Sequence, residues 1–393
     1  MRIALTPEQE ALRDKLRNYF DDICTPEFRA EQMAGHMEGG GPLYWKALRK
    51  MAADGWLGIG WPTEYGGGGA TPIEQMIFAD EAHKANFPFP FLSIGTVGPT
   101  IMRYGTDEQK QDYLPRILAG EINFCIGYTE PSAGTDLASL TTRAVRDGDD
   151  WIINGQKIFT SLAEFAQYVW LAARTDPDAP KHAGLSIFVV PMDAEGVSLT
   201  PIETVGGVRT NSTYYENVRV PAEALVGGEN NGWAMIVSQL NHERVSLTPT
   251  GPPLRLVEQL CEWARETETP DGRRVADLAW VQNNLARARS GVEILKLMNW
   301  KQAWEMTHGH LNPAEASAVK VFASEFTIRC YELLMEVMGQ AAVVKEGSPG
   351  AVLRGEIELR YRTSLILTFG GGTNEVQRDI TAMAGLGLPH YKG

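Results

Sequence analysis

The pattern of apolar and polar residues changes twice along the chain and predicts three regions. Up to about residue 122 the chain carries helix-start signals. Residues 6–9 and 106–109 each place a threonine cap three residues before a glutamine, an arrangement that satisfies free amides at a helix start. The glycines of residues 61–69 interrupt any helix. We therefore expect a helical domain over residues 1–122.

The middle of the chain is rich in short β-branched and aromatic segments, which are typical of strands. Residues 147–150 (DGDD) separate two of these segments and predict a hairpin. The connections are too short for parallel βαβ units, so we expect a β-rich domain over residues 123–229. The expected strands are residues 141–146, 151–154, 168–173, 185–190, 197–202 and 214–220.

Helical spacing returns after residue 230 and continues to the end of the chain. Residues 280–306, 314–338 and 355–367 carry apolar positions at helical intervals, and residues 267–274 read as a loop. Apolar clusters on these helices indicate the core of a helix bundle rather than a ligand-binding site. The predicted fold class is α+β, with a third, helical domain over residues 230–393.

Charge and cysteine content narrow the range of functions. The formal net charge of −13 over 393 residues disfavours a nucleic-acid or anionic-membrane partner. No apolar run approaches the roughly 20 residues of a membrane helix, and the start of the chain lacks an apolar signal core. The four cysteines are widely spaced, which predicts a reduced, cytoplasmic protein, and we expect no metal site.

Two segments carry candidate chemistry. Residues 241–244 (NHER) put Glu243 on an apolar helix, where burial raises the pKa of a carboxylate toward the range of a general base. Residues 370–378 (GGGTNEVQR) bring glycine N–H groups into a helix start, which suits a carbonyl or anionic oxygen. Together they suggest proton abstraction beside a carbonyl. Alternatively, Glu243 is a structural carboxylate paired with an arginine.

Four motifs resemble those of the acyl-CoA dehydrogenases and occur in that family's order. They are residues 61–67 (WPTEYGG), 128–136 (YTEPSAGTD), 154–161 (NGQKIFTS) and 370–378. The resemblance covers essentially the whole chain. It implies an N-terminal helical domain, a middle β-barrel-like domain and a C-terminal four-helix bundle.

Within that family the chain is most similar to bacterial enzymes that desaturate coenzyme A thioesters of sterol side chains. Residues 239–244, 365–375 and 386–389 carry this closer match. These relatives assemble as α2β2 complexes, and the resemblance implies a catalytic subunit of that kind.

The resemblance implies FAD as cofactor and α,β-dehydrogenation of an acyl-CoA. Many members carry the catalytic glutamate at the position of Gly371, which has no side chain. A minority place it just before an arginine on an earlier helix, as Glu243 stands before Arg244. Glu243 is therefore the expected base. Gly371 is expected to give its N–H to the thioester carbonyl, Arg244 to contact substrate, and His242 to be structural.

Further cofactor contacts carry over from the family position by position. Thr129 and Ser161 match hydroxyl residues near the flavin ring, Phe159 stands where an aromatic residue packs on it, and Thr135 matches a hydroxyl residue that meets the acyl-CoA. Any of these hydroxyls could instead be a local cap or turn former. The expected cofactor-binding residues are Tyr128, Thr129, Thr135, Phe159, Thr160, Ser161, Gly370, Thr373 and Glu375, and Thr135 is also expected to bind substrate.

The chain departs from the family where a neighbouring subunit normally binds the adenine half of FAD. Residues 271–277 lack the expected Phe-Gly element, and Glu336 with residues 337–340 replaces a glutamine followed by paired glycines. A second, homologous chain that supplies these contacts would account for both departures. We expect an α2β2 assembly with about half the usual number of FAD sites.

Other readings stay open at this point. The main one is a dehydrogenase that passes electrons to an electron-transfer flavoprotein. A branched-chain acyl-CoA dehydrogenase or an acyl-CoA oxidase is the nearest alternative. A non-catalytic, CoA-binding subunit of the same complex is the alternative from a different class, and Glu243 argues against it.

Overall fold

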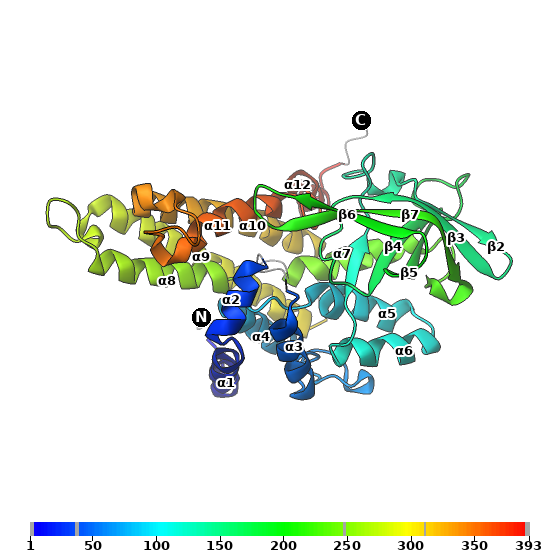
Figure 1. The fold of residues 1–393 in the computed structure, drawn as a ribbon, viewed down its shortest axis with the longest axis horizontal. Coiled ribbons are helices and arrows are strands. Elements are labelled where there is room, and N and C mark those ends of the chain that lie inside the picture. The colour runs from blue at the N-terminus through cyan, green and yellow to red at the C-terminus, as the bar shows by residue number, and fades with distance from the viewer. Residues whose placement is uncertain (1–3, 36–38, 247–248, 310–311, 390–393) are drawn as a thin grey trace.

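A computed structural model describes residues 4–35, 39–246, 249–309 and 312–389. Helices gather at the two ends of the sequence and strands in its middle, as expected (Figure 1). In Figure 1 the N-terminal helices lie below, the sheet at one end and the long C-terminal helices at the other. The predicted α+β class is confirmed.

The described part of the N-terminal region contains six α-helices. Threonine caps start several of them: Thr6 with Gln9 and Thr106 with Gln109 form the two predicted capping boxes, and Thr71 with Glu74 forms a third. The helices are α1 (Pro7–Ile23), α2 (Pro26–Ala34), α3 (Pro42–Ala53), α4 (Pro72–Lys84), α5 (Gly98–Tyr104) and α6 (Asp107–Leu118). The predicted glycine interruption at residues 61–69 holds only one short turn, Thr63–Tyr65.

The middle region is one eight-stranded sheet in the order β6-β7-β3-β2-β4-β5-β8, with β1 beside β4. All six predicted strands are present, and residues 147–150 form the predicted hairpin, with Asp147 opposite Asp150. The strands are β1 (Phe124–Gly127), β2 (Arg143–Asp147), β3 (Asp150–Lys157), β4 (Tyr168–Arg174), β5 (Leu185–Pro191), β6 (Val197–Glu203), β7 (Arg209–Pro221) and β8 (Leu225–Val226).

Parallel pairing was not expected in this sheet but is present in it. Strand β1 runs parallel to β4 over four residue pairs, from Phe124 opposite Tyr168 to Gly127 opposite Leu171. The β2–β3 hairpin connects β1 to β4 along the chain, so these two strands run parallel without a crossover helix between them. The short connections excluded βαβ units but not this arrangement.

Strand β4 explains how the N-terminal helices and the sheet form one body. Trp170 and Ala172 pack into the core shared with the N-terminal helices, whereas Val169, Leu171 and Ala173 pack into the core on the other face of the sheet. Side chains alternate between the two faces of a strand. A strand buried on both faces therefore reads as a continuous apolar run, as β4 does.

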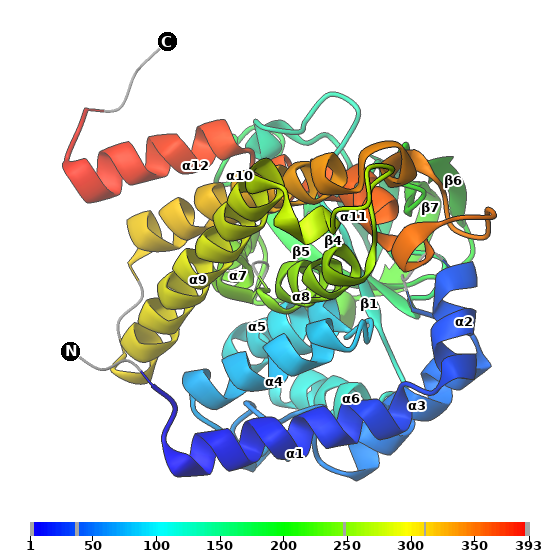
Figure 2. The ribbon, with the colours of Figure 1, turned by 90° about the vertical axis from the view of Figure 1, so that its left-hand side faces the viewer.

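The C-terminal region is a bundle in which α10 contacts α7, α8, α9, α11 and α12. Its helices are α7 (Gly232–Ser246), α8 (Gly251–Glu266), α9 (Ala279–Thr307), α10 (Pro313–Met338), α11 (Glu356–Ser364) and α12 (Asn374–Ile380). Figure 2 shows α12 lying along the outside of this bundle, close to α10. The predicted helix 355–367 divides into α11 and a short 3-10 turn, Leu365–Thr368.

Candidate active site

Two of the sequence motifs meet where strands β1 and β3 end. The first follows β1 at residues 128–130, and the second follows β3 at residues 158–161. The amide of Ile158 donates to the carbonyl of Thr129 at 2.8 Å, which joins the two turns directly. The structure thus brings Thr129 next to the segment that carries Phe159 and Ser161.

A buried ion pair holds this junction. Lys157 Nζ lies 2.9 Å from a carboxylate oxygen of Glu130 and donates to the carbonyl of Tyr128 at 3.1 Å. Thr141 and Thr142 donate their amides to the same carboxylate at 2.7 and 2.8 Å. Burial alone would raise the pKa of Glu130, but Lys157 and these donors outweigh burial and lower the pKa. Burial lowers the pKa of Lys157.

The outer side of the junction presents an aromatic ring and two hydroxyls. Phe159 has a left-handed backbone (φ 59°) and is 59 % exposed, although it is a large apolar residue. Thr129 is half-buried and Ser161 exposed, and no hydrogen bond from either hydroxyl to another described residue is found. Such a face can accept a planar, polar-edged ligand.

Thr160 and Thr135 occupy different surroundings from these two hydroxyls. Thr160 is 1 % exposed, its hydroxyl lies 3.4 Å from that of Thr213, and its backbone exchanges hydrogen bonds with Asn211. It therefore supports the turn from inside the sheet. Thr135 is exposed in the loop after Glu130, where its hydroxyl has no hydrogen-bond partner within the described residues.

The glycine segment lies against α10. Thr373 caps α12 by accepting from the amide of Val376, and Asn374 is buried among Ser324 and Lys320 of α10. Gly370 is exposed and Gly371 partly buried. Glu375 is exposed, and its own backbone N–H and the Thr373 hydroxyl lower its pKa, so it is an anion at neutral pH.

Helix α7 carries residues 241–244, as the sequence predicts. The side chains of residues 241–246, among them Glu243 and Arg244, lie outside what the structure describes, so their roles stay predictions. One turn before Glu243, Gln239 is 2 % exposed and accepts a 2.6 Å hydrogen bond from the Tyr128 hydroxyl. That hydroxyl also accepts from the Trp170 indole N–H at 3.0 Å.

This contact places α7 beside the end of β1. The sequence analysis included Gln239 only as part of a motif and assigned it no role. No local pattern marked it, because its partner Tyr128 lies 111 positions away in sequence.

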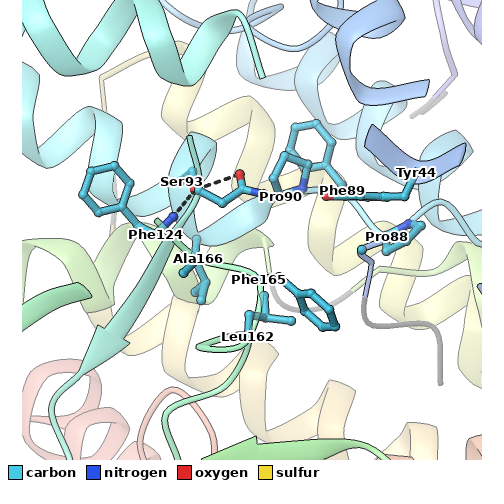
Figure 3. Close-up of a pocket in the computed structure, with 12 residues that line it drawn as sticks. Tyr44, Pro88, Phe89, Pro90, Ser93, Phe124, Leu162, Phe165 and Ala166 are labelled. Atoms are coloured by element: carbon cyan, nitrogen blue, oxygen red, sulfur yellow. Dashed lines mark hydrogen bonds between the residues drawn. The ribbon is translucent and has the colours of Figure 1, made fainter. Parts of the chain in front are cut away.

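A small cavity of about 30 Å³ lies between the N-terminal helices and this part of the sheet. In Figure 3, Leu162 and Phe165 reach it from the segment after Ser161, and Tyr44 and Pro88 lie across from them. Ser93 lies deeper, donating to Asn123 at 3.3 Å and accepting from the Phe124 amide at 2.9 Å. The rest of the lining is Gly40, Phe89, Pro90, Leu92 and Ala166. Sequence analysis did not identify this cavity.

The residues expected on the adenine side of FAD are engaged within the chain. Glu336 accepts from Asn284 at 2.7 Å and pairs with Arg329 at 3.4 Å, and Arg273 pairs with Asp271 at 2.6 Å. An anionic Glu336 with these partners offers no diphosphate site by itself.

The described part of the chain has no group of three or more His, Cys, Asp or Glu side chains suited to a metal ion. Over the same residues, no helix combines the length and apolar character needed to cross a bilayer.

Comparison with known proteins agrees with this geometry along the whole chain. The family models for the acyl-CoA dehydrogenase N-terminal, middle and C-terminal domains match residues 6–121, 125–218 and 230–386. The acyl-CoA dehydrogenase FadE26 of Mycobacterium tuberculosis is 52 % identical over 396 residues, with 99 % of each chain covered.

Two solved structures are similar over their full length. One is a crystal structure of the ChsE4-ChsE5 complex from Mycobacterium tuberculosis (52 % identity, TM-score 0.93), and the other is the Tcur3481-Tcur3483 steroid ACAD (48 % identity, TM-score 0.94). Each comparison covers 100 % of both chains. The three domain matches, the overall fold and the full-length relatives lead to one conclusion: the chain belongs to the acyl-CoA dehydrogenase family.

Proposed function

We propose that the chain catalyses FAD-dependent α,β-dehydrogenation of an acyl-CoA, with Glu243 as the base. The observation that carries this proposal is the junction between the turns after β1 and β3. There a backbone hydrogen bond from Ile158 to Thr129 joins two family motifs beside exposed Phe159. The Tyr128–Gln239 hydrogen bond connects the same junction to the helix that carries Glu243.

The residues at this junction fit a flavin. The hydroxyls of Thr129 and Ser161 have no hydrogen-bond partner among the described residues, so they can bond to the polar edge of the ring system. Phe159 offers an exposed aromatic face against which a planar ring can pack. When bound, FAD supplies the hydride acceptor for the β-hydrogen of the acyl group.

On the proposed assignment, the protein's own groups handle the α-proton. Glu243 removes it, and the Gly371 N–H stabilises the charge that develops on the thioester oxygen. Glycine at position 371 leaves room beside the α-carbon, which suits a branched acyl group. Arg244 and Thr135 are the proposed substrate contacts.

We propose a steroid side-chain thioester as the substrate. The similar Tcur3481-Tcur3483 structure is described as a steroid ACAD. A simpler branched acyl group would use the same base and the same carbonyl contact.

We further propose a homologous partner chain, an α2β2 assembly and electron transfer to an electron-transfer flavoprotein. Two observations favour the partner: the solved relatives are named as two-component proteins, and the adenine-side residues of this chain already have partners of their own. The four cysteines are free thiols, which supports the proposed reducing, cytoplasmic location.

The test is co-expression with a homologous acyl-CoA dehydrogenase chain, followed by anaerobic bleaching of the flavin with a panel of acyl-CoA thioesters. Steroid side-chain thioesters should bleach it fastest. Glu243→Gln should lower the bleaching rate at least 100-fold, the loss expected for a general base, whereas exposed Glu262→Gln should leave it unchanged.

The same preparation discriminates the alternatives. Full turnover by Glu243→Gln would instead favour a different base or a non-catalytic role for this subunit. Rapid reoxidation of the bleached flavin by oxygen would identify an oxidase. A flavin-saturated, active homotetramer of this chain alone would overturn the α2β2 proposal.

A further inference from the structure

The glycine segment is held at three successive points of its backbone. The amide of Gly370 donates to the carbonyl of Ile366 at 3.1 Å. The side-chain amide of Gln377 donates to the carbonyl of Gly371 at 3.0 Å, and Lys320 Nζ donates to the carbonyl of Gly372 at 2.8 Å. The backbone is therefore fixed on both sides of the peptide unit that joins Gly370 to Gly371.

That peptide unit is left open by the described structure. No hydrogen bond from the Gly371 N–H to another described residue is found. Gly371 and Gly372 have φ values of 68° and 88°, which only glycine adopts readily. Two consecutive glycines would move freely without outside support, so the hydrogen bonds to their carbonyls determine where the Gly371 N–H points.

The groups that provide this support are buried and rigidly mounted. Gln377 is 0 % exposed and Lys320 3 % exposed. Lys320 lies on the 26-residue helix α10 and also donates to the Asn374 side chain at 2.8 Å. A Cβ atom placed on Gly372 would lie 2.7 Å from Gln377 Nε2, which shows how closely this amide sits under the turn.

We propose that Gln377 and Lys320 are positioning residues that aim the Gly371 N–H at the thioester carbonyl. The inference rests on the proposed dehydrogenation and adds the two residues that orient its carbonyl donor. A donor stabilises developing charge only when it is already oriented, because reorienting it during the reaction cancels much of the gain. Neither residue needs to touch the substrate.

Gln377→Met is the main test. Methionine has nearly the same length and volume but cannot donate, and the Gln377 Oε1 atom that is also lost has no partner in the described structure. In the co-expressed holoenzyme, kcat should fall about tenfold and KM should change less than twofold. This loss in kcat is smaller than the roughly 10²–10³-fold loss that follows when such a donor is removed altogether. Lys320→Met is the second variant, with a loss of at least the same size.

A spectroscopic measurement separates positioning from general damage. The probe is an α,β-unsaturated CoA thioester of a steroid side chain, labelled with ¹³C at the thioester carbonyl. The carbonyl stretch of the bound probe should move to lower frequency in the wild-type enzyme. In Gln377→Met and Lys320→Met this shift should be smaller, with flavin content and thermal midpoint near wild type in Gln377→Met.

Arg378→Met is the matched control on the same helix. Arg378 makes an exposed ion pair with Glu325 and bonds neither glycine carbonyl, so kcat and the carbonyl shift should stay at wild-type values. If Lys320→Met does not fold, Gln377→Met decides alone. An unchanged carbonyl shift in folded Gln377→Met would overturn the positioning role, whereas a wild-type enzyme that no acyl-CoA bleaches would overturn the proposed function itself.

Discussion

Two buried lysines hold the two halves of the proposed site, and they do so in different ways. Lys157 donates to the carbonyl of Tyr128 at 3.1 Å, and Lys320 donates to the carbonyl of Gly372 at 2.8 Å. Each ammonium group therefore fixes the backbone of a loop that is expected to meet a ligand. Loops lack the regular hydrogen bonds of helices and strands, so a buried cation is one way to restrain them.

The surroundings of the two lysines differ. Lys157 lies inside the sheet and forms an ion pair with Glu130 within the same domain. Lys320 links α10 to the segment before α12, where it binds a carbonyl and the Asn374 amide oxygen. We infer that the Lys157 pair mainly stabilises the fold of the β domain, whereas Lys320 mainly sets the conformation of the glycine segment. Variants at the two positions test this difference in roles.

The largest effect on stability is expected from Lys157→Met. This change leaves the Glu130 carboxylate buried without its cation, which costs about 3–5 kcal/mol. Urea denaturation should show this loss in the free energy of unfolding, and the double variant Lys157→Met/Glu130→Gln should recover much of it. No recovery in the double variant would mean that packing around Lys157, and not the unpaired charge, is responsible.

Lys320→Met should destabilise the chain less, by about 1–3 kcal/mol, because the Gly372 carbonyl and the Asn374 amide oxygen that lose their donor are neutral acceptors. The same denaturation experiment compares it with Lys157→Met. A loss as large as that of Lys157→Met would contradict the proposed division between the two lysines.

Acid should weaken the β domain through Glu130. The folded protein lowers the pKa of this carboxyl from its ordinary value of 4.5, so its contribution to stability is complete above pH 4.5 and is lost as the pH falls below that value. Between pH 4.5 and about 3 the thermal midpoint of the wild type should therefore decline more steeply than that of Glu130→Gln. Parallel curves for the two proteins would contradict the ion pair as the source.

The smallest effect is expected from Lys181→Met. Lys181 pairs with Asp136 at 2.9 Å in the loop that carries Thr135, but both side chains are about half exposed. Exposed pairs contribute little, so the free energy of unfolding should change by no more than about 0.5 kcal/mol. A loss that approaches that of Lys157→Met would show that burial is not what separates these lysines.

Regular elements were the most predictable part of the molecule. The expected helix 280–306 is α9 (Ala279–Thr307), and the expected strand 168–173 is β4 (Tyr168–Arg174). The first carries sustained helical periodicity and the second a continuous apolar run, so local preference and burial agree. The short strand β1 was not predicted, because four residues carry too little pattern and its partner β4 lies more than forty residues away.

The candidate site was predictable as a set of motifs but not as an arrangement. Thr129, Phe159 and Ser161 were chosen by resemblance, and the structure brings their turns together through one backbone hydrogen bond. Lys320 and Gln239 could not be singled out in this way. Their importance comes from contacts with residues more than fifty positions away, which no local pattern encodes.

The sequence by itself determined the three-region architecture, the family motifs and the absence of a side chain at position 371. Each of these is a property of residue type and spacing along the chain. Only the tertiary structure decided which buried groups support the Gly371 amide and which hydroxyls face outward. Hydrogen bonds are directional and short-ranged, so their partners exist only once the chain is folded.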